Sequence, residues 1–381
     1  MLLLDLSHTS HSRAQTGIQR VCRALQRELD VSATPITWDP YARQWRGLND
    51  GERRTLNASV PARKRRSVWP LSSKLSGWRS RLLGPPHVLP TATGLIVPEL
   101  FSPDTARAIP FLKVPGPRVA LFHDAIALKL PELTPARTVA RFPAYLQELL
   151  TFDGIAAVSE DSAECLRDYW RWLGVTATPT IATIALGVAR REPSGDMSNP
   201  GQTRLRILCV GTIEGRKNHL ALLEACEALW RDQCEFELQL IGLGRADTAA
   251  PALAKIEALK RSGRPLIYDG SATDDELEAA YAACHFTIYP SLCEGFGLPV
   301  IESLQHGKPC ICSGRGALGE SARGGGCVLL DSVDSTALTA ALRKLITTPA
   351  EITTLAHAAR QRTFRTWGDY VRDLTDWMGT L

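Results

Sequence analysis

The stretch YPSLCEGFGLPVIE, residues 289–302, joins a strand, a glycine loop and a helix start. The apolar run HFTIYP at 285–290 predicts a buried strand just before the loop. After the loop, Pro299 suits the first position of a helix, and Gly307 is predicted to end it. In an open α/β sheet, ligands bind outside the carboxyl ends of the strands. The stretch therefore predicts a ligand site at this edge of a sheet.

The loop of this stretch combines two glycines with two flanking carboxylates. Gly295 and Gly297 let the backbone turn sharply and approach a ligand. The first N–H groups of the helix, near Leu298, favour an anion such as a diphosphate. A carboxylate accepts two hydrogen bonds from a vicinal diol, so Glu294 and Glu302 can hold sugar and ribose hydroxyls, one each. Two glutamates alone would be read as solvated charges, and the glycine loop between them favours a site.

The second half of the chain alternates apolar runs with helix-like stretches. The runs predict strands at 206–211, 236–242, 266–269, 285–290, 309–312 and 327–331. Helices are predicted between most of them, for example at 219–231 and 274–283. This alternation predicts a parallel sheet wrapped by helices, which is a Rossmann-like domain.

The stretch VGTIEGRKN, residues 210–218, repeats the pattern of a strand end followed by a helix start. Its Arg216 and Lys217 can supply cations for a diphosphate, although basic residues after a strand are commonly solvated. The spacing departs from G-x-x-x-x-G-K-[ST], which leaves an ATPase without support. The sequence offers no Asp-x-Asp pair at a strand end, and TDDE at 273–276 is typical of a capped first helical turn. We therefore expect fixed cations, and no metal ion, to neutralise the diphosphate.

The first half is less regular but has the same character. It begins with LLLDLS at 2–7 and a helix pattern from Gly17 to about Leu29. Later apolar runs, which predict a second doubly wound sheet, are ITW (36–38), GLIVPEL (94–100), RVALFHDA (118–125), GIAAVS (154–159) and TIATIAL (180–186). The polar stretch at 190–204 predicts a linker. With 381 residues the chain suits two domains, at 1–190 and 205–364.

A basic, aromatic insertion at about 53–86 interrupts the first domain. From Arg53 to Pro98 there is no Asp or Glu, and nine Arg and Lys residues lie between Arg53 and Arg81, interleaved with tryptophans. The formal net charge of the chain is only +4, so this positive field is local. A solvated insertion, contact with an acidic membrane surface or an anionic lipid-linked acceptor, and nucleic-acid binding are all open. Nucleic acid is the least favoured, because the rest of the chain is slightly acidic.

The composition, with 44% hydrophobic and 22% charged residues, is that of a globular protein. The first apolar run meets Asp5 too early for a signal peptide, and no run is long enough to span a membrane. We expect a cytoplasmic chain, peripheral at the inner face of the membrane where the insertion meets lipid. Most of the ten cysteines lie in or beside apolar runs, as core cysteines do in a reducing compartment. Cys310 and Cys312 share one strand face, but no second pair of Cys or His stands at zinc spacing, so no metal site is predicted.

Taken together, VGTIEGRKN, YPSLCEGFGLPVIES and GKPCICS resemble the family 4 retaining glycosyltransferases, whose signature is two glutamates separated by seven residues, as Glu294 and Glu302 are. The resemblance spans most of the chain. FHDA (122–125) is similar to the family's active-site histidine segment, VSEDSAECL (158–166) to its strand-to-helix step before the hinge, TGIQR (16–20) to its first glycine loop, and FRTW (364–367) to the start of its last helix. It implies the α/β GT-B architecture, in which two Rossmann-like doubly wound domains face a cleft. A C-terminal helix at 365–381 then crosses back to the first, acceptor-side domain.

The resemblance also implies roles for individual residues. Arg216 and Lys217 would bind the donor diphosphate, Glu302 the ribose, and Glu294 the donor sugar. His123 would lie near the bond being broken, so the implied catalytic residues are His123, Glu294 and Lys217. The residues implied to bind the donor are Gly17, Thr212, Arg216, Lys217, Gly295, Phe296, Gly297, Leu298 and Glu302. In retaining enzymes of this fold the acceptor attacks from the face that the diphosphate leaves, so the protein positions the substrates and stabilises charge.

The implied activity is transfer of a hexosyl unit from a nucleotide sugar to a glycan or lipid-linked acceptor, in surface polysaccharide or glycoconjugate synthesis, with no cofactor and no metal ion. EGFGLP together with GT-x-E-x-RKN is most similar to bacterial polysaccharide mannosyltransferases, which favours a GDP-mannose donor. A UDP- or dTDP-sugar donor stays open. The family often has Pro where Gly215 and Gly319 stand here, departures that bear on loop rigidity and on the acceptor.

Three other kinds of enzyme are alternatives to a glycosyltransferase. A nucleotide-sugar epimerase or a sugar phosphorylase would have a similar site without a separate acceptor. An NAD-dependent dehydrogenase would account for GLGRAD at 242–247 after a strand, but the third glycine of G-x-G-x-x-G is absent. No acidic residue at a strand end about ~20 positions later completes that fingerprint. The dehydrogenase is therefore disfavoured, whereas an epimerase or a phosphorylase stays open, and product analysis with and without acceptor would separate these from a transferase.

Overall fold

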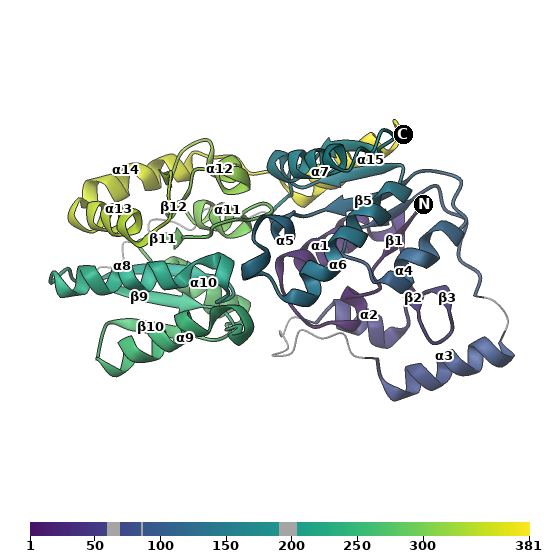
Figure 1. Cartoon of the computed structure of the whole chain (residues 1–381), viewed down its shortest axis with the longest axis horizontal. Coiled ribbons are helices and arrows are strands. Elements are labelled where there is room, and N and C mark those ends of the chain that lie inside the picture. The colour runs from purple at the N-terminus through teal and green to yellow at the C-terminus, as the bar shows by residue number, and fades with distance from the viewer. Residues whose placement is uncertain (59–68, 85–86, 190–203) are drawn as a thin grey trace. The chain divides into compact units, whose positions relative to one another are not determined.

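The computed structural model describes residues 1–58, 69–84, 87–189 and 204–381. The chain divides into two compact units. Unit 1 comprises Met1–His123, Arg141–Gly187 and Arg365–Leu381, and unit 2 comprises Asp124–Ala140 and Val188–Phe364 (Figure 1). The predicted domain bounds, 1–190 and 205–364, assigned residues 124–140 to the first domain. In the structure these residues cluster with unit 2. The predicted linker at 190–204 lies almost entirely outside the described residues.

The sheet of unit 1 has seven strands in the order β3-β2-β1-β4-β5-β6-β7. The strands are β1 (Leu2–Asp5), β2 (Ala33–Asp39), β3 (Gln44–Gly47), β4 (Leu95–Val97), β5 (Arg118–Phe122), β6 (Gly154–Ala157) and β7 (Thr180–Thr183). All neighbours are parallel except β2 and β3, which form an antiparallel hairpin that the apolar pattern did not predict. The carboxyl ends of β1, β4 and β5 therefore lie at one edge of the sheet.

The helices of unit 1 include the predicted first and last ones. They are α1 (Gly17–Leu29), α2 (Asp50–Leu56), α3 (Leu71–Leu83), α4 (Pro103–Ala108), α7 (Glu160–Trp172) and α15 (Trp367–Met378), while α6 (Ala136–Glu148) contains the boundary between the units. Helix α15 contacts α1, and Trp377 from α15 lies against Gly154 of β6. The C-terminal helix therefore belongs to unit 1, as predicted. No helix of the described residues is both long enough and apolar enough to cross a membrane.

The sheet of unit 2 has six parallel strands in the order β10-β9-β8-β11-β12-β13. They are β8 (Leu205–Val210), β9 (Phe236–Ile241), β10 (Leu266–Asp269), β11 (Phe286–Tyr289), β12 (Cys310–Ser313) and β13 (Cys327–Leu330). The helices are α5 (Ile126–Lys129), α8 (His219–Arg231), α9 (Ala246–Arg261), α10 (Asp274–Ala283), α11 (Leu298–Gln305), α12 (Gly316–Ala322), α13 (Ser335–Thr347) and α14 (Pro349–Arg360). All six predicted strands are present within one residue at each end, and α8 and α10 have the predicted bounds.

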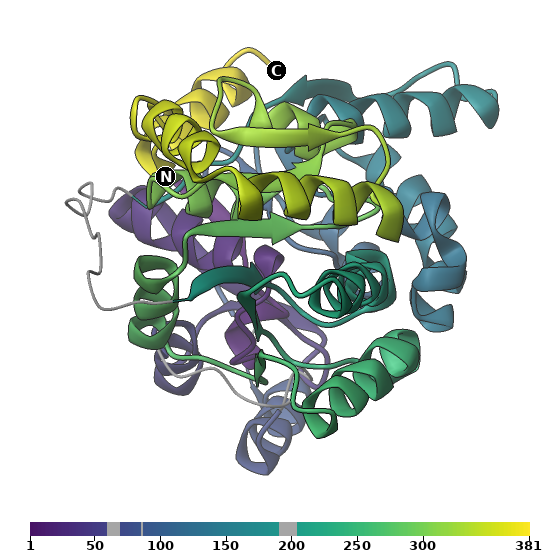
Figure 2. The same ribbon diagram turned by 90° about the vertical axis from the view of Figure 1, so that its left-hand side faces the viewer.

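Helices cover both faces of this sheet, because successive strand residues point to opposite sides. Ile207 and Cys209 of β8 pack in one core with α8, α9 and α13. Leu208, between them in sequence, packs on the other face with Tyr281 of α10. Farther along that second face, α11, α12 and α14 pack on β11 and β12. In Figure 2 the strands of unit 2 lie side by side between these helices. Unit 2 is therefore the predicted Rossmann-like layer structure.

Candidate functional site

Two cations lie where β8 gives way to α8 in unit 2. The 3₁₀ helix η6 (Gly215–Lys217) holds Arg216 and Lys217, and Asn218 ends it in the left-handed region, with φ 57°. The Asn218 amide donates to the carbonyl of Val333 at 2.7 Å. The backbone amide of Leu292 donates to the carbonyl of Arg216 at 2.9 Å, which joins this turn to the loop after β11. The turn that carries the cations is thus fixed from two sides.

Both cations pair with Glu294. Arg216 Nη1 donates to Glu294 Oε2 at 2.8 Å and to the carbonyl of Cys293 at 3.2 Å. Lys217 Nζ forms an ion pair with Glu294 Oε1. The other nitrogen of the guanidinium, Nη2, lies 2.7 Å from Glu214 Oε1. Glu294 lies 78 positions after Arg216 and 77 after Lys217 in the sequence. The structure therefore brings together three residues that were predicted to share one site.

The charge of Glu294 follows from these contacts. Burial alone would raise the pKa of this carboxyl, but the charges of Arg216 and Lys217 outweigh it and lower the pKa to about 2. The pKa of Arg216 is raised, because Glu294 and Glu214 outweigh the effect of its burial. Burial, together with the charge on Lys217, lowers the pKa of the neighbouring His219 to about 3. At neutral pH the site holds an ionised carboxylate that can accept hydrogen bonds but cannot donate a proton.

The glycine loop starts α11 one residue earlier than predicted. Gly297 is the N-cap with φ 107°, a conformation that residues with a Cβ rarely adopt. Leu298 is then the first helical residue and Pro299 the second, so the prediction of Pro299 at the first position was wrong. The helix ends at Gln305, and Gly307, with φ 65°, follows its C-cap as predicted. No side chain caps the start of α11, which leaves its first turn available to a ligand.

Glu302 is more buried than its predicted role at an open site suggests. It lies in the second turn of α11 with 5% of its surface exposed. Its side chain is therefore part of the packed interior of unit 2. The physical reason is that α11 carries apolar neighbours on both sides of it, since Val300, Ile301 and Leu304 are also buried. A role in ribose binding remains a prediction, and its test must include stability.

The ion-pair network extends to Arg245, which the sequence did not single out. Arg245 follows β9, and its Nη2 lies 2.8 Å from Asp247 Oδ2, while Nη1 lies 3.9 Å from Glu214 Oε2. The same stretch, GLGRAD, had been considered only as part of a dinucleotide fingerprint. The stretch follows β9, which lies next to β8 in the sheet. A basic residue at the carboxyl end of a neighbouring strand was therefore the signal for a third cation at this edge.

Steric constraints explain why glycine stands at positions 215 and 319, where the family often has proline. A Cβ at Gly319 would lie 2.1 Å from the carbonyl oxygen of Gly314, and one at Gly215 would lie 2.8 Å from that of Thr248. Real Cβ atoms do not approach backbone atoms so closely. Close backbone packing in α12 and η6 therefore requires glycine at both positions in this chain.

Two predicted site residues belong to unit 1. His123 directly follows β5 and is 8% exposed, and its Nε2 lies 2.7 Å from the carbonyl oxygen of Pro98. Because a carbonyl only accepts, Nε2 carries the proton of this hydrogen bond. Gly17 is the first residue of α1, after the N-cap Thr16, and a Cβ there would have no neighbour within 4 Å. The roles of both residues remain predictions.

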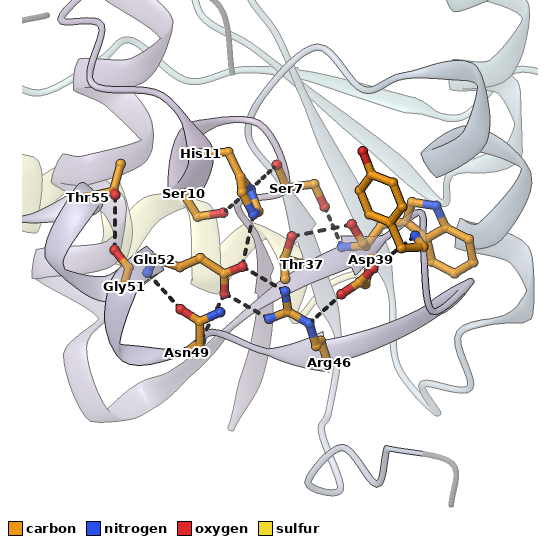
Figure 3. Close-up of polar contacts among 12 residues, drawn as sticks. Ser7, Ser10, His11, Thr37, Asp39, Arg46, Asn49, Gly51, Glu52 and Thr55 are labelled. Carbon is orange, nitrogen blue, oxygen red and sulfur yellow. Dashed lines mark hydrogen bonds and ion pairs between the residues drawn. The ribbon is translucent and has the colours of Figure 1, made fainter. Parts of the chain in front are cut away.

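Unit 1 also contains a buried polar cluster that the sequence analysis missed. His11 Nε2 lies 2.9 Å from Glu52 Oε1, and Arg46 donates to both oxygens of Glu52 and to Asp39 at 2.7 to 2.9 Å (Figure 3). Burial would raise the pKa of Glu52, but the hydrogen bonds from Arg46 and His11 lower it to about 2. Trp69 stacks on the His11 ring at 3.8 Å, which ties the basic insertion to this cluster. The histidines of SHTSHS, directly after β1, were the only signal in the sequence.

Two further buried acids of unit 1 lie where strands end. Asp5 is the last residue of β1, and Glu99 follows β4. Burial raises the pKa of Asp5 to about 7, with a further contribution from the charge of Glu99. Burial also raises the pKa of Glu99 to about 7, although hydrogen bonds from Thr9 and His8 oppose the rise. The pKa values of both carboxyls are therefore raised mainly by burial, and groups with perturbed pKa values are frequent at functional sites.

Comparison with known proteins finds relatives for the segment that carries this site. Residues 204–348, which span the cation turn and the glycine loop, match the family described as glycosyl transferases group 1. The chain is 26% identical over 340 residues to the serotype-specific mannosyltransferase WbdA of Escherichia coli, covering 81% of this chain and 38% of that protein. It is 34% identical over 202 residues to O-antigen chain mannosyltransferase B of Escherichia coli, covering 51% and 52%. The chain thus spans about half, or less, of these relatives.

A solved structure shares the fold. HepE from Anabaena, determined in complex with UDP and glucose, superposes with a TM-score of 0.70 at 14% identity and covers 100% of this chain and 99% of its own. At that identity the likeness shows the GT-B fold alone. The chain therefore has the GT-B fold, its residues 204–348 match the glycosyl transferases group 1 family, and its sequence is similar to mannosyltransferases of Escherichia coli.

Proposed function

We propose that the chain is a retaining glycosyltransferase that transfers mannose from GDP-mannose to a glycan or lipid-linked acceptor in surface polysaccharide synthesis. The observation that carries the proposal is the meeting of Arg216, Lys217 and Glu294 beside the start of α11. Cations and the N-terminus of a helix bind the negative charge of a nucleotide diphosphate, and an ionised carboxylate accepts hydrogen bonds from sugar hydroxyls. The named relatives are mannosyltransferases, which supports mannose as the sugar.

In this proposal the ion pairs of Arg216 and Lys217 with Glu294 are present when no donor is bound. Before the donor binds, Lys217 and Arg216 neutralise Glu294, which limits the cost of burying its charge. The donor diphosphate then replaces Glu294 as partner of Lys217, and the carboxylate turns to the sugar hydroxyls. The cations remain close to the bridging oxygen, where negative charge develops as the glycosidic bond breaks. No protein nucleophile is required, and His123 is assigned to the sugar by resemblance.

The donor assignment is tested by measuring nucleotide diphosphate release from GDP-mannose, UDP-glucose, UDP-N-acetylglucosamine and a dTDP-hexose. We expect GDP-mannose to be the best donor, release to increase when a mannose-containing acceptor is present, and the product linkage to be α by NMR. Faster turnover of a UDP- or dTDP-sugar would contradict the donor. A β-linked product would contradict retention, and acceptor-independent conversion of one nucleotide sugar into another would indicate an epimerase.

A lipid surface is the proposed partner of the basic insertion. Helix α3 exposes five large apolar side chains, and four of them form one stripe at spacings of four, three and four residues. Their exposed fractions are 76% for Leu71, 64% for Leu75, 56% for Trp78 and 79% for Leu82. Lys74, Arg79 and Arg81 lie on the same helix, which has no acidic residue. An apolar stripe among cations fits an anionic bilayer surface, where it would lie in the interface. Arg63 to Arg66, the most basic part of the insertion, lie outside the described residues.

We expect the double variant Leu75→Asp/Leu82→Asp to bind anionic vesicles about 100-fold more weakly than wild type, because each buried leucine contributes roughly 1.5 kcal/mol. The measurement is co-sedimentation with phosphatidylglycerol-containing vesicles at low salt. Phe111→Asp is the control, since Phe111 is 83% exposed outside α3. Wild-type protein that ignores such vesicles, or an equal loss in the control, would refute the membrane assignment. Binding of oligonucleotides in place of vesicles would favour nucleic acid.

A further inference from the structure

Three cysteines of unit 2 come together on one face of its sheet. Cys310 and Cys312 are two residues apart on β12, so their side chains point the same way. Cys327 of β13 is paired with Cys310 across the two parallel strands. The three sulfur atoms all lie within 4.8 Å of one another. The prediction of no metal site rested on spacing along the chain and could not include Cys327, which only the strand register brings beside the other two.

The surroundings of this cysteine cluster are apolar. The residues packed around it are Tyr289, Val300, Leu304, Leu318, Ala322 and Ala359. Cys310 and Cys312 are fully buried, whereas Cys327 is partly exposed on β13, the last strand of the sheet. The exposed edge at Cys327 gives an ion a way in. Among the described residues, no fourth His, Cys, Asp or Glu joins the group.

A positive charge lies beside the cluster. Arg362 lies beside the segment that leads into β13, because it donates to the carbonyl of Gly325, two residues before Cys327. Arg362 is held there by hydrogen bonds from Nη2 to the carbonyl of Ser321 at 3.1 Å and from Nη1 to that of Gly325 at 3.5 Å. Metal-bound thiolates carry net negative charge, which a fixed neighbouring cation compensates. The cluster therefore has ligands, a charge partner and an entrance.

We propose that Cys310, Cys312 and Cys327 form a three-coordinate thiolate site for a soft metal ion, of which monovalent copper is the representative. Thiolates select soft ions, and monovalent copper accepts three sulfur ligands, whereas structural zinc almost always takes four. With metal–sulfur bonds of about 2.3 Å, a trigonal site requires sulfurs about 4 Å apart. The three sulfurs, all within 4.8 Å of one another, are close enough to adopt that separation. Binding releases the thiol protons and involves no change of oxidation state.

The site lies behind the donor loop. Val300 and Leu304 of α11 pack in the same cluster as the cysteines, on the helix that also carries Glu302. A metal ion on the three sulfurs would fix β12 and β13 beneath this helix. We therefore expect a bound soft metal ion to change donor affinity.

The test is anaerobic titration of reduced, full-length protein with monovalent copper in the presence of bathocuproine disulfonate, a copper chelator that competes with weak sites. Wild type and the control Cys165→Ser should each retain one copper ion per chain. Cys327→Ser should lose it, with an affinity at least about 100-fold lower, since even the loss of an outer partner costs 10- to 100-fold. X-ray absorption of the wild-type complex should show three sulfurs at about 2.3 Å.

Several results would overturn the site. One is equal copper retention in Cys327→Ser and wild type, and another is a two-sulfur coordination shell. Retention of zinc in preference to copper would contradict the assignment to a three-coordinate soft ion. The absorption measurement uses unaltered protein, so the proposal is testable even if a cysteine variant folds poorly. Because copper retention is measured without donor or acceptor, failure here leaves the proposed transferase function untouched, and failure of that function leaves this site untouched.

Discussion

Lys217→Ala is expected to lower kcat by about 10²- to 10³-fold, the cost of losing one well-placed group that stabilises transition-state charge. Lys217 lies on η6 and reaches Glu294, the carboxylate next to the glycine loop. A departing nucleotide diphosphate gains negative charge, which either a divalent ion or fixed cations must neutralise. We propose that Lys217, with Arg216 and the start of α11, does this without metal. The measurement is the initial rate with saturating GDP-mannose and acceptor.

The same experiment tests metal independence when each protein is assayed with EDTA and with added Mg²⁺ or Mn²⁺. Lys344→Ala is the matched control, because Lys344 is also a lysine paired with a glutamate, Glu351, but is 62% exposed on α13. Its loss should change the rate little. If EDTA abolished wild-type turnover and Mn²⁺ restored it, metal independence would be wrong. If Lys217→Ala kept most of its activity, the site assignment would be wrong.

Glu302→Ala is expected to weaken GDP binding by about 100-fold. A carboxylate that accepts two hydroxyl hydrogen bonds contributes roughly 1.5 kcal/mol or more for each, and about 1.4 kcal/mol is tenfold in affinity. Isothermal titration calorimetry with GDP gives this number directly. Glu302→Gln keeps the shape of the side chain and one acceptor oxygen, so an intermediate loss is expected for it.

The Tm of each Glu302 variant is measured together with its affinity for GDP, because Glu302 is only 5% exposed. Binding of the ribose predicts a large loss of GDP affinity with a modest change in Tm. A large fall in Tm with unchanged affinity for GDP would mean that Glu302 supports the fold of α11 and does not bind the nucleotide. Since affinity and Tm are measured on the same variants, the two roles are distinguishable.

Local sequence predicted the elements of unit 2 well, for identifiable reasons. Strands β8 to β13 are short apolar runs between polar turns, and α8 and α10 have clear boundary residues. Thr273 and Glu276 form a capping box at the start of α10, as the TDDE pattern predicted. These features depend on neighbours a few residues away. The start of α11 was misplaced by one residue because Gly297, in a conformation that suits glycine, outweighed the usual preference for proline at the first position.

Contacts between distant segments could not be predicted in the same way. The β2–β3 hairpin has weak apolar alternation, since Gln44–Gly47 reads QWRG, and it was missed. The cluster of His11, Arg46 and Glu52 joins residues up to 41 positions apart, which no local pattern links. Residues 124–140 lie within the first half of the chain but cluster with unit 2. Each of these depends on strand order and packing, which are non-local.

The sequence by itself determined the α/β class and the order of strands and helices in the second half, and it nominated the residues that we propose to bind the donor. Strand periodicity, glycine loops and charged residues at strand ends are local, so they can be read without coordinates. Only the tertiary structure decided that Arg216 and Lys217 share one carboxylate, that Glu302 is buried, and that Cys327 joins Cys310 and Cys312. The physical reason is that ion pairing, burial and metal-binding geometry depend on distances in space, which strand register and helix packing set.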